Sequence, residues 1–234
     1  MAAPSLHLKA VSKTFVLHNQ GGAELPVLRG ATLSVMPGEC VALDGPSGSG
    51  KSTLLKCVYG SYRASSGEIL LSSRERALEI SKARAQQILR MRRDTLAYVS
   101  QFLRVIPRVP AIDIVAEPLL EEWGDSEDAM RRARAEAQHL LLRLRIPPRL
   151  WHVPPATFSG GEQQRINIAR SFIRRMPVML LDEPTASLDM ENRMTVIAMI
   201  REARERGVAI LGIFHDESTR SAVATRTVNM AEFQ

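Results

Sequence analysis

A glycine-rich loop that begins at Gly45 constrains the fold of this chain more than any other segment. It reads Gly45-Pro46-Ser47-Gly48-Ser49-Gly50-Lys51-Ser52-Thr53, which matches the pattern G-x-x-x-x-G-K-[ST]. An apolar run over 40–43 precedes it and a helical pattern over 51–59 follows, so the segment predicts a strand, a phosphate-binding loop and a helix. The N–H groups of such a loop converge at a helix N-terminus, where the helix dipole favours an anion. We expect Lys51 to pair with the β- and γ-phosphates, Ser52 to ligate Mg²⁺ and Thr53 to reach the α-phosphate.

The rest of the chain alternates between strand-like and helical patterns, which predicts an α/β fold with a largely parallel sheet. An N-terminal antiparallel hairpin is expected around the Gly21-Gly22 pair, with strands over 6–16 and 27–35. Further strands are expected over 96–99, 178–181 and 209–214, and helices over 75–93, 126–145, 161–176 and 191–206. We interpret the proline-broken helical stretch of about 102–160 as a subdomain inserted into a core of about 1–101 and 161–234. The whole of 1–234 is then one domain.

The apolar strand over 178–181 ends in two acids, Asp182 and Glu183. Open α/β sheets bind ligands at the carboxyl ends of their parallel strands, so both carboxylates are expected near the phosphate loop. Asp182 is a candidate for holding Mg²⁺ through water, and Glu183 for acting on the water that attacks the γ-phosphate. Taken alone, the pair is more typical of a solvated loop. The phosphate loop in the same chain favours the functional interpretation.

A second glycine-containing segment, Phe158-Ser159-Gly160-Gly161-Glu162-Gln163-Gln164-Arg165, precedes another predicted helix. Ser159 and Glu162 have the spacing of a capping box, which explains both polar residues but not the two glycines between them. Glycines at a helix N-terminus expose N–H groups that a phosphate can approach. Because the chain already has one complete phosphate loop, this segment suggests an anion site that serves the nucleotide of another molecule.

These motifs and their order resemble those of ATP-binding-cassette (ABC) ATPases over almost the whole chain, with Phe158 where leucine is commoner. The resemblance implies that the chain binds and hydrolyses ATP with Mg²⁺. It also implies that a second ABC subunit, the same or a related chain, completes the site with its signature segment. The residues it assigns to nucleotide binding are Phe15, on which adenine stacks, the loop from Gly45 to Thr53, and Ser159, Gly160, Gly161 and Glu162.

The same resemblance assigns four catalytic residues, Lys51, Gln101, Glu183 and His215. Gln101 is expected to sense Mg²⁺ and the attacking water, and His215 to contact the γ-phosphate. The residues expected to bind Mg²⁺ are Ser52, Gln101 and Asp182. Ser187-Leu188-Asp189 resembles the loop that crosses the interface between two subunits.

A finer resemblance is to the PhnL-type subunits of the carbon–phosphorus lyase system, which breaks down phosphonates in bacteria. The stretch that most resembles them follows Gln101 and reads Phe102-Leu103-Arg104-Val105-Ile106-Pro107-Arg108. In transporter members, the groove beside this glutamine receives a helix of the membrane subunit, so a changed run fits a changed partner. The resemblance implies a non-transport ATPase that works with soluble lyase subunits. Two alternatives stay open: the energy-coupling subunit of a membrane transporter, for example for phosphonate uptake, and a nucleotide-gated scaffold with little turnover.

Composition adds weaker expectations. Lys and Arg outnumber Asp and Glu by 31 to 25, and this net charge of +6 slightly favours anionic partners. No signal peptide and no run of about 18 apolar residues is apparent, so we expect a cytoplasmic chain without direct membrane insertion. Cys40 and Cys57 form no metal-binding or disulfide pattern, and no basic and aromatic stripe suggests nucleic acid.

Asp44 stands immediately before Gly45. A carboxylate close to a triphosphate is electrostatically unfavourable unless it points away or meets a cation. We therefore expect the Asp44 carboxylate to point away from the phosphates.

Overall fold

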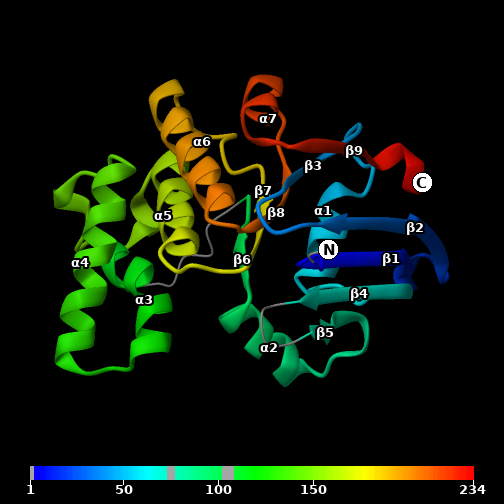
Figure 1. The fold of residues 1–234 in the computed structure, drawn as a ribbon, viewed down its shortest axis with the longest axis horizontal. Helices are drawn as coiled ribbons and strands as arrows, with labels where there is room; N and C mark the ends of the chain where they lie inside the picture. Colours follow the sequence, from blue (N-terminus) through cyan, green and yellow to red (C-terminus); the bar gives the residue numbers. More distant parts are fainter. Residues whose placement is uncertain (1–2, 73–76, 102–107) are drawn as a thin grey trace.

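The computed structural model describes residues 3–72, 77–101 and 108–234, and Figure 1 shows a group of helices on its left side and the N-terminal strands on its right side. The run Phe102–Pro107, on which the predicted soluble partner depended, lies outside the described residues. Among the described residues, no helix has the length and apolar character needed to cross a membrane.

Within the described part of the chain, the central sheet has five strands, and every hydrogen-bonded pair in it is parallel. Its order is β6 (Leu96–Val99), β7 (Val178–Asp182), β8 (Ala209–Ile213), β3 (Cys40–Asp44) and β9 (Arg226–Asn229). Alternate residues of β3 belong to different hydrophobic clusters, Cys40 and Ala42 to one and Val41 and Leu43 to the other. Both faces of the sheet are therefore covered, which explains the unbroken apolar sequences of β7 and β8.

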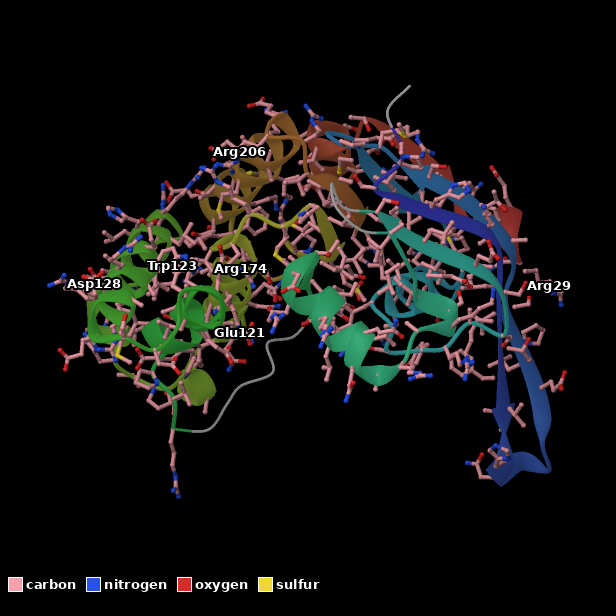
Figure 2. The ribbon with its side chains drawn as sticks, turned by 60° about the horizontal axis from the view of Figure 1, so that its bottom comes forward. Arg29, Glu121, Trp123, Asp128, Arg174 and Arg206 are labelled. Atoms are coloured by element: carbon pink, nitrogen blue, oxygen red, sulfur yellow. The ribbon has the colours of Figure 1, made fainter. Side chains whose placement is uncertain are left out.

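A second, antiparallel sheet of four described strands packs on one of these faces. Its order is β2 (Ala23–Val35), β1 (Leu6–Leu17), β4 (Ser66–Ser72) and β5 (Ala77–Glu79). The 3₁₀ helix η1 (His18–Gln20) and the Gly21-Gly22 pair connect β1 to β2, so the expected hairpin is confirmed. Figure 2 shows Arg29 of this hairpin at the opposite end of the molecule from Asp128.

Five helices belong to the part of the structure that holds the parallel sheet. They are α1 (Lys51–Val58), α2 (Ala85–Asp94), α5 (Gly160–Phe172), α6 (Met190–Glu205) and α7 (Glu217–Val223). Short 3₁₀ helices lie at η2 (Ile80–Lys82), η3 (Pro148–Leu150), η4 (Pro155–Thr157) and η5 (Met230–Phe233). Asp189 and Asp216 cap α6 and α7 by accepting hydrogen bonds from the N–H groups of Asn192 and Thr219, at 2.8 and 2.9 Å.

Two further helices, α3 (Ala111–Trp123) and α4 (Glu127–Arg143), pack on each other and on α5, at the left of Figure 1. Ser126 caps α4, since its Oγ accepts a hydrogen bond from Ala129 N at 3.2 Å. Arg170 of α5 contacts Glu117 of α3 at 2.6 Å, which adds an ion pair to the apolar packing between these helices.

The structure corrects several sequence-based expectations. The helix predicted over 75–93 is wrong in its first half, because β5 pairs with β4 there and α2 begins at Ala85. Burial of Ile80 and packing of Leu78 against the core favour the strand over local helical preference. The strands β4 and β9 and the helix α7 were not predicted, and α3 was not predicted individually, although it lies in the stretch of about 102–160 that was expected to be helical. Pro118 lies inside α3, which hid its helical pattern.

Candidate nucleotide-binding site

The predicted phosphate loop connects β3 to α1, as the sequence indicates. Gly45 and Gly50 have φ values of +136° and +87°, which other residues rarely adopt. A Cβ on Gly50 would also lie 2.8 Å from Leu28 Cδ2 and 3.0 Å from the carbonyl oxygen of Val27. The loop can follow this path because glycine stands at both positions.

Lys51 folds its side chain back over the loop. Its Nζ donates hydrogen bonds to the carbonyl oxygens of Gly45 at 2.6 Å and Pro46 at 2.8 Å, and lies 3.5 Å from Ser49 Oγ. The ammonium group is thus held at the loop itself, where a bound phosphate chain would meet it.

Ser52 and Asp182 bring oxygen atoms together from α1 and the end of β7. Ser52 Oγ donates to Asp182 Oδ1 at 3.3 Å, and the hydroxyl of Tyr98 donates to Asp182 Oδ2 at 3.0 Å. Asp182 is only 5% exposed, so these hydrogen bonds compensate the burial of its carboxylate. A hydroxyl and a carboxylate fit Mg²⁺, which takes few protein ligands when phosphate oxygens and water supply the others.

Glu183 has two polar partners from neighbouring strand ends. Its Oε1 lies 2.8 Å from His215 Nε2, and its Oε2 accepts a hydrogen bond from Gln101 Nε2 at 3.5 Å. Its φ of +53° is unusual for a residue with a side chain, and its N–H donates to the Ile213 carbonyl at 3.1 Å. This hydrogen bond holds the peptide between Asp182 and Glu183, and the two side chains leave it in different directions.

The parallel sheet explains why distant residues meet here. Gln101, Glu183 and His215 follow the carboxyl ends of β6, β7 and β8, which are neighbours in the sheet. The phosphate loop follows β3, next to β8. The candidate site therefore lies where open α/β sheets bind ligands.

The segment Phe158–Arg165, which resembles the ABC signature, contains the start of α5 and the predicted capping box. Ser159 Oγ accepts a hydrogen bond from Glu162 N at 3.3 Å, and Glu162 Oε2 accepts one from Ser159 N at 2.9 Å. Hydrogen bonds from the Ser159 hydroxyl and N–H lower the pKa of the Glu162 carboxyl. A Cβ on Gly160 would meet open space, whereas one on Gly161 would lie 2.8 Å from the carbonyl oxygen of Ser187. Gly161 thus has a packing role within the chain that the sequence did not indicate.

Phe15 lies in β1 of the antiparallel sheet, whereas Asp182 ends β7 of the parallel sheet. Its ring meets Tyr62 edge-to-face, with 5.3 Å between centroids and 84° between planes, and Lys13 Nζ lies 4.7 Å from its centroid. The stacking of adenine on Phe15 stays a prediction.

Two residues that contact the predicted site were missed from the sequence. Tyr98 lies in β6 beside β7, and its place near a strand end could have indicated a contact with Asp182. Arg220 of α7 donates to Asp44 Oδ1 at 2.7 Å. These two residues are separated by 176 positions, and no sequence pattern links them.

The sequence profile of the ABC transporter family matches residues 28–186, more than half of the chain. The chain belongs to this family. It is an ABC ATPase that binds ATP with Mg²⁺, and the predicted fold class is confirmed.

Among proteins of known structure, the chain is similar to the ATP-binding cassette MJ0796 in a dimeric post-hydrolysis state bound to ADP and Pi. The TM-score is 0.86 at 27% identity, over 96% of this chain and 93% of that one. Among curated proteins, it is 42% identical to the lipoprotein-releasing system ATP-binding protein LolD of Maricaulis maris, over 90% of this chain and 87% of that protein. It is 34% identical to the macrolide export ATP-binding/permease protein MacB of Marinobacter nauticus, where the match spans 98% of this chain but 34% of the relative.

These relatives correct the finer functional prediction. A non-transport subunit of the carbon–phosphorus lyase complex was expected, partnered by soluble lyase subunits. The relatives found are instead a lipoprotein-releasing ATPase and a macrolide exporter, so they contradict that expectation and agree better with the transporter alternative. The run after Gln101, taken as the sign of a changed partner, was too weak a basis for it.

Proposed function

We propose that this chain is the ATP-hydrolysing subunit of a membrane export system of the lipoprotein-releasing type, acting at the cytoplasmic face with a separate membrane-spanning permease. The observation that carries this proposal is the match to LolD, which extends over 90% of this chain and 87% of the relative. The MacB relatives hold the matching part within a much longer chain that includes a permease.

In the proposed mechanism, the phosphate loop receives the triphosphate through its N–H groups, and the Lys51 ammonium exchanges its carbonyl partners for phosphate oxygens. Ser52 and Asp182, together with Gln101, would hold Mg²⁺, which would neutralise phosphate charge. The hydrogen bond from Tyr98 keeps the Asp182 carboxylate in place, at 3.0 Å. Phe15 supplies an aromatic face for adenine.

Glu183 orients the attacking water and accepts its proton. Two contacts support this role, since His215 and Gln101 hold one carboxylate oxygen each, at 2.8 and 3.5 Å. His215, which is 65% exposed, is free to turn from Glu183 toward a γ-phosphate. Gln101 connects this site to the segment that follows it in the chain.

Ser159, Gly160 and Gly161 serve the nucleotide bound to a second ABC subunit, and Glu162 holds Ser159 in its capping position. The open space at Gly160 and the exposed helix start support this assignment. The similarity to the dimeric cassette MJ0796 supports the pairing of two such subunits. Hydrolysis then lets the two subunits separate, and the permease follows that motion.

We further propose that residues 1–234 act as one ABC ATPase domain, with a core of about 1–101 and 161–234 and a helical subdomain of about 102–160. The packing of α3 and α4 on α5 supports this division, because α5 begins at the proposed boundary.

The proposal can be tested by purifying tagged Glu183→Gln from the source cells, with ATP added and membranes solubilised in mild detergent. We expect a membrane-spanning permease to co-purify, and wild-type ATPase activity to rise several-fold when that permease is present in lipid vesicles. Lys51→Ala, which lacks the phosphate-binding charge, is the control that should not trap the complex. Recovery of the chain without any membrane protein, and turnover that vesicles do not change, would contradict the proposal.

A further inference from the structure

Asp44 and Arg220 form an ion pair directly before the phosphate loop. Arg220 Nη1 lies 2.7 Å from Asp44 Oδ1, and the two side chains are 22% and 47% exposed. Asp44 is the last residue of β3, and Gly45 follows it. The pair therefore joins the start of the phosphate loop to α7.

The Asp44 carboxylate is unfavourable for the reaction unless it is neutralised. The carbonyl oxygen of the next residue, Gly45, accepts a hydrogen bond from Lys51 Nζ at 2.6 Å. Asp44 is therefore adjacent in the chain to a residue that contacts the lysine predicted to bind the phosphates. A triphosphate carries several negative charges, and an added carboxylate nearby opposes its binding. An arginine on that carboxylate cancels much of this repulsion.

The helix that carries Arg220 has contacts at both of its ends. Asp216 caps the start of α7, and Arg220 N donates to the Asp216 carbonyl at 2.9 Å. At the other end, Arg204 of α6 donates to the Val223 carbonyl at 3.0 Å. These contacts hold the backbone of α7 in the place from which the Arg220 side chain reaches Asp44.

We propose that Arg220 is a positioning residue for nucleotide binding, which neutralises Asp44 and keeps its carboxylate turned away from the phosphates. Arg220 acts through Asp44 and does not touch ATP. The helix α7 begins at Glu217, two residues after His215, so Arg220 lies on the element that follows the predicted γ-phosphate contact in the chain. The proposal rests on ATP binding by this chain and does not depend on which permease it serves.

The test is a double-mutant cycle on the purified full chain, read as the Kd of a fluorescent ATP analogue and as KM and kcat for ATP. Arg220→Gln leaves the Asp44 charge uncompensated and should raise KM about threefold to tenfold, with a smaller effect on kcat. The increase should shrink as salt is added. In Asp44→Asn/Arg220→Gln the repulsive charge is gone as well, and KM should return to within about twofold of wild type.

The cycle separates this role from a purely structural one, because the double variant lacks the ion pair too. If the pair served only to fasten β3 to α7, the double variant would bind ATP as poorly as Arg220→Gln, and the proposal would be overturned. An unchanged KM for Arg220→Gln would overturn it equally. Arg134→Gln breaks a comparable Arg–Asp pair, at 2.8 Å between α4 and α3, and is the matched control with wild-type KM.

Two more variants keep the test decisive. If Arg220→Gln does not fold, Asp44→Asn alone is informative, since a KM at or below that of wild type is expected and a raised KM would refute the proposal. Lys51→Ala reports on the assay, because it must lose nucleotide binding. If it does not, the assignment of the phosphate loop fails, which is distinct from a failure of the role of Arg220.

Discussion

The imidazole of His215 contacts the carboxylate of Glu183, with 2.8 Å between Nε2 and Oε1. The two residues follow neighbouring parallel strands, in which Asp182 is paired with Ile213. Glu183 therefore lies one residue beyond a fixed pair and His215 two residues beyond it. This register, together with the left-handed backbone of Glu183, sets the contact.

Glu183→Gln should still bind ATP but lower turnover at least about 100-fold, because an amide cannot accept the proton of the attacking water. Nucleotide binding and phosphate release, measured on the same preparation, test this. Glu205→Gln, an exposed change at the end of α6, is the control with normal turnover. Unchanged turnover in Glu183→Gln would remove Glu183 from its proposed role.

His215→Ala should lower turnover about tenfold or more, since it removes the partner that holds one Glu183 oxygen. If His215 acts together with Glu183, the double variant Glu183→Gln/His215→Ala will be no slower than Glu183→Gln alone. Independent, additive losses would show that the 2.8 Å contact has no part in the reaction.

Asp182→Asn should raise the Mg²⁺ concentration needed for half-maximal turnover about tenfold, because a neutral amide is a weaker ligand for this hard cation. Tyr98→Phe removes one hydrogen bond to the same carboxylate and should give a smaller shift of about twofold to threefold. A magnesium titration at fixed ATP measures both. Equal Mg²⁺ dependence in wild type and Asp182→Asn would argue against the proposed metal site.

Gly161→Ala should destabilise the fold, because its methyl group would lie 2.8 Å from the Ser187 carbonyl oxygen. The cost of such overpacking is about 1–3 kcal/mol, or a fall in Tm of several degrees. Gly160→Ala meets open space and should melt close to wild type. Thermal melting of the two neighbouring variants is a direct comparison, and similar Tm values would contradict the packing argument.

Asp216→Ala should lower Tm at neutral pH, because the carboxylate caps α7. Hydrogen bonds from Ser218 and Thr219 lower its pKa from 3.8 to about 2. A lowered folded-state pKa means that the stabilisation is complete above 3.8 and is lost as pH falls toward 2. The Tm difference between wild type and variant should therefore be constant from pH 7 to pH 5 and shrink below about pH 4. A difference that persists unchanged at lower pH would show that the charge of Asp216 is not what stabilises α7.

The local structure around the motifs with strong sequence signals was predicted correctly. Three local structures depend on interactions within a few residues of sequence. They are the phosphate loop, the apolar strand before Asp182 and the capping box at Ser159. The elements that were missed depend on contacts elsewhere. β5 is a strand because it pairs with β4, and α3 tolerates Pro118 because its apolar residues pack against α4 and α5.

The same distinction applies to the site. The sequence led us to propose Gln101, Glu183 and His215 as catalytic residues. Their contacts with one another depend on the strand order of the sheet, which local sequence patterns do not encode. The partner of Asp44 was not predictable because Arg220 lies on a short helix that the sequence did not indicate.

The close approach of Gly161 to Ser187 has a mechanical consequence. Because there is no room for even one methyl group between them, a displacement of the start of α5 toward the loop after Glu183 would push on the backbone of that loop. Gln164 strengthens this link by donating to the Pro184 carbonyl at 3.4 Å. Movement of one subunit's α5 against a nucleotide would therefore displace the backbone next to its own Glu183. In the proposed pairing of two subunits, ATP bound at one site would thereby alter the geometry of the other site.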